Sequence, residues 1–161
     1  RRGFYGFNMN IFYHVRREKL DFVFPLIARF CELDELLEQS DFIVVAVDLN
    51  ANTQHLIDAE AFKKMQSHAV FVNISRGAVV DEQALIQALE QKQIFAAGLD
   101  VYEKEPLQDS ALFQLHNVVT LPHVGSATSV TRKKMAELAY QNLVKALEGG
   151  QPQYVVNPEF R

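Results

Sequence analysis

The sequence has little of what marks several special classes of protein. Its 161 residues include one cysteine, Cys31, so no disulfide can form within the chain, which suits a reducing compartment. The longest apolar run, residues 42–47, is far shorter than the roughly 18 residues of a membrane helix, and no signal peptide is recognisable. The net charge of -4 argues against general binding of nucleic acid. We therefore expect a cytoplasmic protein that binds neither membrane nor nucleic acid and holds no metal ion.

The chain is long enough and apolar enough to fold as one globular domain. With 161 residues, 48% of them hydrophobic, it can bury roughly 70% of its unfolded surface. Its charge is uneven, because residues 1–20 hold five basic side chains and only one acidic one, Glu18. The first residue is Arg1 and not methionine, so we expect the start of the chain to be cut.

Short apolar segments alternate with helical patterns along the chain. We expect strands at 9–13, 42–47, 69–72, 94–99 and 118–121. Asp58 and Asp81 are placed to cap helices, and a last helix is expected over 126–148, burying an apolar stripe and ending at Gly149. This order predicts an α/β fold, a doubly wound parallel sheet of the Rossmann type with helices on both faces. Another α/β layout with the same order of elements is the alternative.

Ligands of such sheets bind at the carboxyl ends of the strands, so the residues that follow each strand are the first site candidates. His123 follows the fifth strand, and an imidazole can accept or donate a proton near neutral pH. A carboxylate within reach, with Glu105 as the candidate, would favour the charged imidazole. Arg76 offers a planar fork of donors that suits the carboxylate of an oxo acid. These three side chains are the catalytic candidates.

The same residues also have plainer explanations. His123 can be an ordinary surface histidine, Glu105 and Glu103 can be solvated loop charges, and Arg76 can lie at the surface end of a helix. Cys31 is expected to be an inert, apolar-like side chain. Ordinary surface positions are expected for His14, His55, His68 and His116.

Two adjacent arginines, Arg16 and Arg17, follow the first strand, where a sheet of this type that binds NAD carries an acidic residue. An arginine at this place accommodates the extra phosphate of NADP. The pair therefore favours NADP(H), with NAD(H) as a second cofactor that can be used. An ordinary solvated turn is the alternative explanation.

Three motifs carry a resemblance to a known family. Asn73–Gly77 (NISRG), Gly98–Pro106 (GLDVYEKEP) and Leu121–Thr128 (LPHVGSAT) occur in the order and spacing of the D-isomer-specific 2-hydroxyacid dehydrogenases, and the likeness runs the length of the chain. Within this family, Gly6–Met9, the arginine pair and Val156–Pro158 are most similar to the bacterial glyoxylate/hydroxypyruvate reductases, a subgroup that includes 2-ketogluconate reductases.

The resemblance implies a role for each matched residue. Arg76 holds the substrate carboxylate and keto oxygen, Glu105 pairs with His123, and His123 donates a proton as hydride reaches the keto carbon. Asp100 lies beside the nicotinamide carboxamide, and Gly125 and Ser126 close the pocket near the nicotinamide. The remaining cofactor-binding residues are His14, Arg16, Arg17, Asp48, Leu49, Asn50, Ile74 and Ser75. Asp48 departs from the family, whose members often have a small residue or proline there.

A complete member of the family has more than this sequence contains. The first strand and the Gly-x-Gly-x-x-Gly turn that cradles the pyrophosphate are missing, and so is the preceding substrate domain. We expect residues 1–125 to be a truncated dinucleotide-binding domain and 126–161 to be a helix and tail leading back to the absent domain. The chain alone is expected to be inactive. We call the chain together with such an upstream half the parent protein.

The implied activity of the parent is the NADPH-dependent reduction of small 2-oxo acids, such as glyoxylate, hydroxypyruvate and 2-ketogluconate, to D-2-hydroxy acids. A noncatalytic corepressor-like module that binds NAD(P) is one alternative, and an NAD-dependent dehydrogenase of the phosphoglycerate type is another. The resemblance implies a homodimer. Exposed apolar content is also expected at Phe4, Tyr5, Phe7, Phe22 and Phe24, which is typical of a partner surface.

Overall fold

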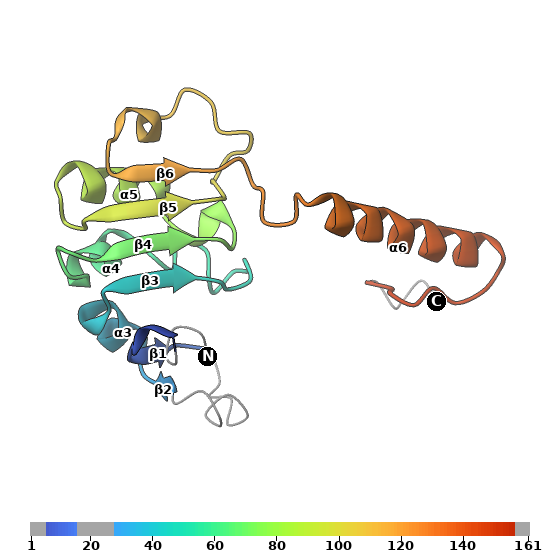
Figure 1. Cartoon of the computed structure of the whole chain (residues 1–161), viewed down its shortest axis with the longest axis horizontal. Helices are drawn as coiled ribbons and strands as arrows, with labels where there is room; N and C mark the ends of the chain where they lie inside the picture. The colour runs from blue at the N-terminus through green and yellow to red at the C-terminus, as the bar shows by residue number, and fades with distance from the viewer. Residues whose placement is uncertain (1–5, 16–27, 157–161) are drawn as a thin grey trace. The chain divides into compact units, whose positions relative to one another are not determined.

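The computed structural model describes residues 6–15 and 28–156. The chain divides into two compact units, Arg1–Pro122 and His123–Arg161. The domain boundary expected from the sequence lies after residue 125. Figure 1 shows the elements of each unit.

Among the described residues of the first unit, six strands pair in parallel in two groups (Figure 1). Strand β1 (Ile11–Tyr13) pairs with β2 (Ala28–Phe30). The larger sheet has the order β3 (Phe42–Val45), β4 (Val70–Asn73), β5 (Ala96–Leu99) and β6 (Val118–Thr120), all parallel. Five of these strands match expected segments. The expectation of only five strands was wrong, because β2 is a short strand with an exposed arginine at its centre.

Helices alternate with the strands, and two of them begin directly after the predicted caps Asp58 and Asp81. Helix α3 (Leu33–Gln39) precedes β3, and α4 (Ala59–Lys64) and α5 (Glu82–Glu90) lie before β4 and β5. Asp58 accepts a hydrogen bond from the Ala61 amide at 2.9 Å, and Asp81 accepts one from the Ala84 amide at 3.0 Å. Both predicted caps are therefore confirmed. Two short 3-10 turns, η1 (Gly77–Val79) and η2 (Ala111–Gln114), also lie in the described part of the unit.

The core lies between the larger sheet and helices α3, α4 and α5. Ile43, Phe71 and Ala97 stand in register on one face of the sheet and are buried. Phe62 of α4 meets Phe71 edge-on, with 5.4 Å between ring centroids. In Figure 1 the strands pass in front of α4 and α5.

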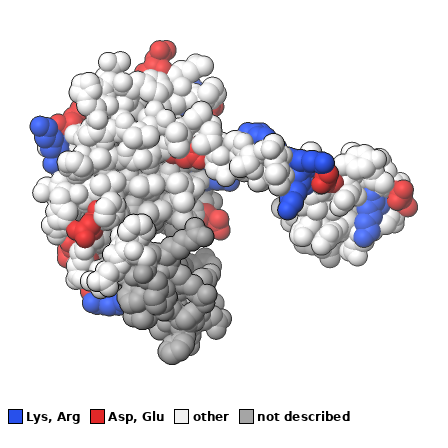
Figure 2. Space-filling view, viewed as in Figure 1, with Lys and Arg blue, Asp and Glu red and all other residues white. Residues whose placement is uncertain are grey.

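The opposite face of this sheet is open. Phe42, Val44 and Val119 are 59%, 57% and 64% exposed, so the described residues of the first unit cover one face of this sheet, where helices on both faces were expected. The surface of the first unit that is visible in Figure 2 carries few charged atoms. The uninterrupted apolar sequence of β3 is typical of a strand covered on both faces. In the described part of the first unit, however, only one face of β3 is covered.

A groove separates the two groups of strands. It has a volume of about 900 Å³ and lies between residues 8–15 on one side and residues 42–44 of β3 on the other. No described strand pairs with β3 on this side.

The second unit is built around α6 (Ser129–Leu147). Its cap is Thr128, whose hydroxyl accepts from the Thr131 amide at 3.1 Å, so the helix starts later than the predicted residue 126. The helix ends before Gly149, whose φ of 75° suits glycine. The apolar stripe expected to be buried is exposed, with Leu143 at 59% and Leu147 at 79%, and no residue of α6 is buried.

Candidate functional site

The carboxyl ends of four parallel strands form one edge of the larger sheet, because β3, β4, β5 and β6 all run in the same direction. The loops that leave this edge carry Asp48, Ser75 and Asp100. Ligand sites of open α/β sheets lie outside such an edge.

A cavity of about 560 Å³ opens beyond the ends of β3 and β4. Five predicted site residues line it together with Ala46 and Val47: Asp48, Leu49, Ile74, Ser75 and Arg76. Its volume lies within the range of small-molecule sites, roughly 300–1,000 Å³. The cavity therefore brings together the predicted residues of two loops that are far apart in the sequence.

Asn73, the last residue of β4, fixes the loop that carries Arg76. It is 1% exposed, and its side-chain oxygen accepts from both the amide and the hydroxyl of Ser75, at 3.0 Å each. Its side-chain nitrogen donates to the Arg76 carbonyl at 3.2 Å. Sequence reasoning quoted Asn73 only as part of a motif. The signal for its role was a polar residue at the end of an otherwise apolar strand.

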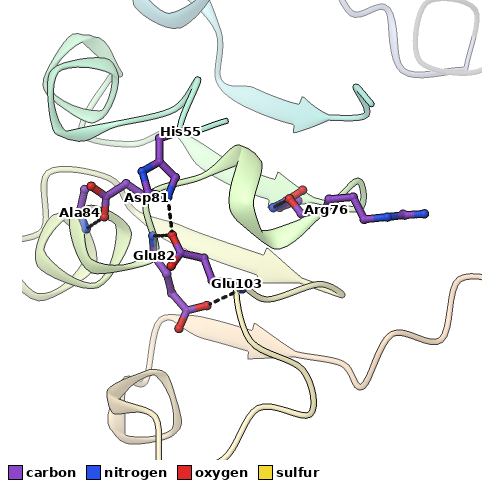
Figure 3. Close-up of polar contacts among 7 residues, drawn as sticks. His55, Arg76, Asp81, Glu82, Ala84 and Glu103 are labelled. Carbon is purple, nitrogen blue, oxygen red and sulfur yellow. Dashed lines mark hydrogen bonds and ion pairs between the residues drawn. The ribbon is translucent and has the colours of Figure 1, made fainter. Parts of the chain in front are cut away.

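The side chain of Arg76 reaches outward from this loop. One guanidinium nitrogen donates to the Ser75 carbonyl at 2.7 Å, while the residue as a whole is exposed. Figure 3 shows the Arg76 side chain extended away from the neighbouring group formed by His55, Glu82 and Glu103. The arrangement offers a fixed positive charge at the cavity, and such a charge can bind a carboxylate.

The loop after β4 and the loop after β5 touch through their backbones. A Cβ on Gly77 would lie 1.8 Å from the carbonyl carbon of Tyr102 and 2.2 Å from the amide nitrogen of Glu103. Only glycine permits this approach. As a consequence, the segment that carries Arg76 and the segment that carries Glu105 are packed directly together.

Tyr102 anchors the loop after β5. It is 7% exposed, and its hydroxyl proton is shared between the carbonyl of Leu121 at 2.8 Å and that of Leu99 at 3.2 Å. Burial is the main cause that raises the pKa of this phenol. The Tyr102 amide in turn donates to the Glu105 carboxylate at 3.1 Å, which gives this carboxylate a defined place.

The other predicted residues lie elsewhere. His14 follows β1, its Nδ1 donates to the Cys31 carbonyl at 3.0 Å, and its ring stacks on Phe30. Asn50 folds into its own turn, where its side chain accepts from the Asn52 amide at 2.9 Å, and it does not line the cavity. Asp100 donates its amide to the Asn73 carbonyl at 3.1 Å. Arg16 and Arg17 lie outside the described residues.

His123, Gly125 and Ser126 belong to the second unit. His123 has a φ of 52°, in the left-handed region that few residues other than glycine adopt. Such a conformation is one of the forms of backbone strain that collect at functional sites. The pairing of Glu105 with His123, and the closing of a pocket by Gly125 and Ser126, stay predictions.

Three further features are absent from the described part of the chain: a metal site, a membrane-spanning helix and a reactive cysteine. No group of three such side chains among the described residues could hold a metal ion. None of the helices in the described part of the chain is long and apolar enough to cross a membrane. Cys31 is buried, and burial is the main cause that raises the pKa of its thiol, so it remains a poor nucleophile.

Comparison with known proteins gives consistent matches. The model of the family described as "D-isomer specific 2-hydroxyacid dehydrogenase, NAD binding domain" matches residues 2–125. A glyoxylate/hydroxypyruvate reductase B from Cronobacter sakazakii is 51% identical over 159 residues, which is 98% of this chain and 49% of that protein. One from Escherichia coli O1:K1 is 50% identical over 158 residues. The chain thus spans about half the length of the curated relatives it matches.

Solved structures show the same partial coverage. An NADPH-dependent glyoxylate/hydroxypyruvate reductase from Sinorhizobium meliloti, in complex with NADP and malonate, superposes with a TM-score of 0.86 at 34% identity. The match covers 96% of this chain and 48% of the other. A glyoxylate reductase from Paecilomyes thermophila matches with a TM-score of 0.83 at 40% identity, over 97% of this chain and 47% of the other.

Proposed function

Because this chain belongs to the D-isomer-specific 2-hydroxyacid dehydrogenase family, we propose that it supplies the cofactor-binding half and the catalytic residues of an NADPH-dependent 2-oxoacid reductase. The substrates of the parent protein are small 2-oxo acids such as glyoxylate, hydroxypyruvate and 2-ketogluconate, and the products are D-2-hydroxy acids. The observation that carries this proposal is the cavity at the strand ends, which has Arg76 on its wall and the Glu105 loop packed against the Arg76 loop.

The cavity suits one part of a dinucleotide. Val47, Leu49 and Ile74 offer apolar surface to a flat ring, and the polar side chain of Ser75 lies among them. When bound, the reduced nicotinamide supplies the hydride. Asp48 also lines the cavity, and a carboxylate that faced a phosphate would cost affinity unless it points away.

The chain's own residues supply binding and the proton. The guanidinium of Arg76 holds the substrate carboxylate and polarises the keto oxygen. The imidazolium of His123 donates a proton to this oxygen as hydride reaches the carbon, so that the carbonyl becomes a hydroxyl. The carboxylate of Glu105 stabilises the charged imidazole before the transfer.

The test is steady-state kinetics of the parent protein. We expect NADPH oxidation that depends on glyoxylate or hydroxypyruvate. Arg76→Ala removes charge-assisted hydrogen bonds of about 1.5–3 kcal/mol, so kcat/KM for the oxo acid should fall roughly 10- to 150-fold or more. Lys63→Ala removes a cation from the exposed ion pair with Glu60 on α4 and should change little. A parent protein that binds NADPH but reduces none of the three acids would support the corepressor-like alternative.

We also propose that the parent protein is a cytoplasmic homodimer. The single cysteine, which is buried, suits a reducing compartment. Of the five aromatic residues expected at a partner surface, the structure describes Phe7, which is 78% exposed. A monomeric mass by light scattering at micromolar concentration would contradict the dimer.

A further inference from the structure

One polar cluster ties together three segments that leave the carboxyl edge of the sheet. His55 belongs to the segment between β3 and α4, Glu82 is the first residue of α5, and Glu103 lies in the loop after β5. Figure 3 shows these side chains converging, while Arg76 extends the other way. His55 was expected to be an ordinary surface histidine, but its ring lies against the Glu103 carboxylate.

The contacts within the cluster are reciprocal. The Nε2 atom of His55 lies 2.8 Å from the Glu103 carboxylate, and the same carboxylate oxygen accepts from the Glu82 amide at 3.2 Å. In return, the Glu103 amide donates to the Glu82 carboxylate at 3.2 Å. Glu103 is therefore held by its side chain and by its backbone at the same time.

Each partner is itself fixed. The amide of His55 donates to the Ala78 carbonyl at 2.9 Å, and its φ of 49° marks a constrained backbone. Glu82 stands in the first turn of α5, where the helix dipole favours a negative charge such as that of Glu103. Asp81, the other acidic group at this end of α5, caps the helix by accepting a hydrogen bond from the Ala84 amide.

We propose that His55, Glu82 and Glu103 are positioning residues that hold Glu105 in place for proton delivery. This inference rests on the proposed function. Glu105 lies two residues after Glu103, and its carboxylate accepts from the Tyr102 amide at 3.1 Å. Tyr102 and Glu103 are neighbours that lead into Glu105, and both are held, Tyr102 through its hydroxyl and Glu103 through its backbone and side chain, so the segment that presents the carboxylate is fixed just before it.

Two variants of Glu103 distinguish the role of its side chain as a hydrogen-bond acceptor from the role of its negative charge. Glu103→Ala removes the acceptor for both His55 and the Glu82 amide. Glu103→Gln keeps a side-chain oxygen that accepts from both. The matched control is Asp41→Ala, because Asp41 and His68 form an exposed carboxylate–histidine pair with a 2.7 Å contact just before β3 and β4, at the other edge of the sheet.

In the parent protein, we expect Glu103→Ala to lower kcat for glyoxylate roughly 5- to 10-fold, the effect of about one hydrogen bond, with the KM for NADPH unchanged. Glu103→Gln should restore most of this loss, and Asp41→Ala should leave kcat unchanged. If Glu103→Ala behaves like Asp41→Ala, or if Glu103→Gln is as slow as Glu103→Ala, the proposal is wrong.

Amide hydrogen exchange of the full chain tests the same idea without any activity. Glu103→Ala should speed exchange at the amides of residues 102 and 103 roughly 5- to 10-fold, and Glu103→Gln and Asp41→Ala should not. Unchanged exchange at these two amides would overturn the proposal. A parent protein that reduces no oxo acid would refute the proposed function alone, and the exchange result would still decide whether the cluster holds the loop.

Discussion

Gly77 is the residue at which the loops after β4 and β5 meet. Gly77→Ala would place a Cβ 1.8 Å from the Tyr102 carbonyl carbon and 2.0 Å from its oxygen, and no rotation of a side chain relieves a clash with backbone. We expect the free energy of unfolding to fall by at least the roughly 1–3 kcal/mol typical of overpacking. Denaturant unfolding measures this difference.

Gly98 provides the matched control for Gly77. A Cβ there would meet only the side chain of Val72, at 3.8 Å, which is an ordinary contact. Gly98→Ala in β5 should therefore leave the free energy of unfolding nearly unchanged. Equal losses for the two variants would contradict the close approach of the two loops.

Glu82 makes stability depend on pH in a defined direction. Burial, opposed by the Glu103 amide and reinforced by the Glu103 charge, raises the pKa of Glu82 above its usual 4.5. The folded state then holds this proton more tightly than the unfolded state does. Its stabilising contribution is complete below the unfolded pKa and is lost as pH rises through the folded pKa.

Glu82→Gln removes this dependence and keeps an acceptor for the Glu103 amide. We expect the variant to gain stability relative to the original chain at pH 7 and not at pH 4. Since Glu82 is only partly buried, solvent screening keeps the difference to a fraction of about 1 kcal/mol. Thermal unfolding at both pH values measures this difference in stability. A gain at pH 4 alone would contradict a raised pKa of Glu82 in the folded state.

At the scale of the elements, helix α5 depends on its cap. The Asp81 carboxylate satisfies the Ala84 amide, and the helix leads directly from the loop that follows Arg76. Asp81→Ala should cost about 1 kcal/mol of unfolding free energy. Asp81→Asn keeps the acceptor and should cost much less. Chemical denaturation of the two variants checks this, and equal losses would assign the effect to charge.

The elements also show what local sequence can predict. The strands β3, β4, β5 and β6 were foreseen because each is a short apolar run, and the caps at Asp58 and Asp81 were foreseen because a capping contact spans three residues. Strand β2 was not, because its partner β1 and not its own composition makes it a strand. The fold class was predicted from the alternation of strands and helices and the family from the three motifs, and both are confirmed.

The residues around the candidate site also fall into those that the sequence could predict and those that it could not. The cavity residues Asp48, Leu49, Ile74, Ser75 and Arg76 could be predicted, because the topological rule that places ligands at strand ends needs only the strand boundaries. The cluster of His55, Glu82 and Glu103 could not, because its hydrogen bonds join residues 21 positions apart. No periodic pattern reports such a contact.

At the scale of the whole molecule, cofactor choice is the sharpest prediction. A charge-assisted hydrogen bond to the 2'-phosphate contributes about 1.5–3 kcal/mol, which corresponds to roughly 10- to 150-fold discrimination. We expect the parent protein to prefer NADPH to NADH by at least about tenfold in kcat/KM. Arg16→Ala combined with Arg17→Ala should remove most of this preference and leave the use of NADH nearly unchanged.

The comparison of kcat/KM for both cofactors, in the parent protein and in the double variant, tests this preference. Added salt should weaken it, because the contact with the phosphate is screened. Equal use of NADH and NADPH by the unaltered protein would return Arg16 and Arg17 to the interpretation of a solvated turn.

The break between β1 and β3 has a consequence for handling this chain by itself. Among the described residues, each of these strands is paired on one side only. Strand β3 consists of Phe42, Ile43, Val44 and Val45, and it has no lysine or proline that would hinder pairing with another chain. Unpaired backbone groups along such an edge act as a template for any extended peptide. The same edge therefore makes the isolated chain prone to aggregate at high concentration, and a solubilising charge introduced at exposed Val44 would be the first remedy to try.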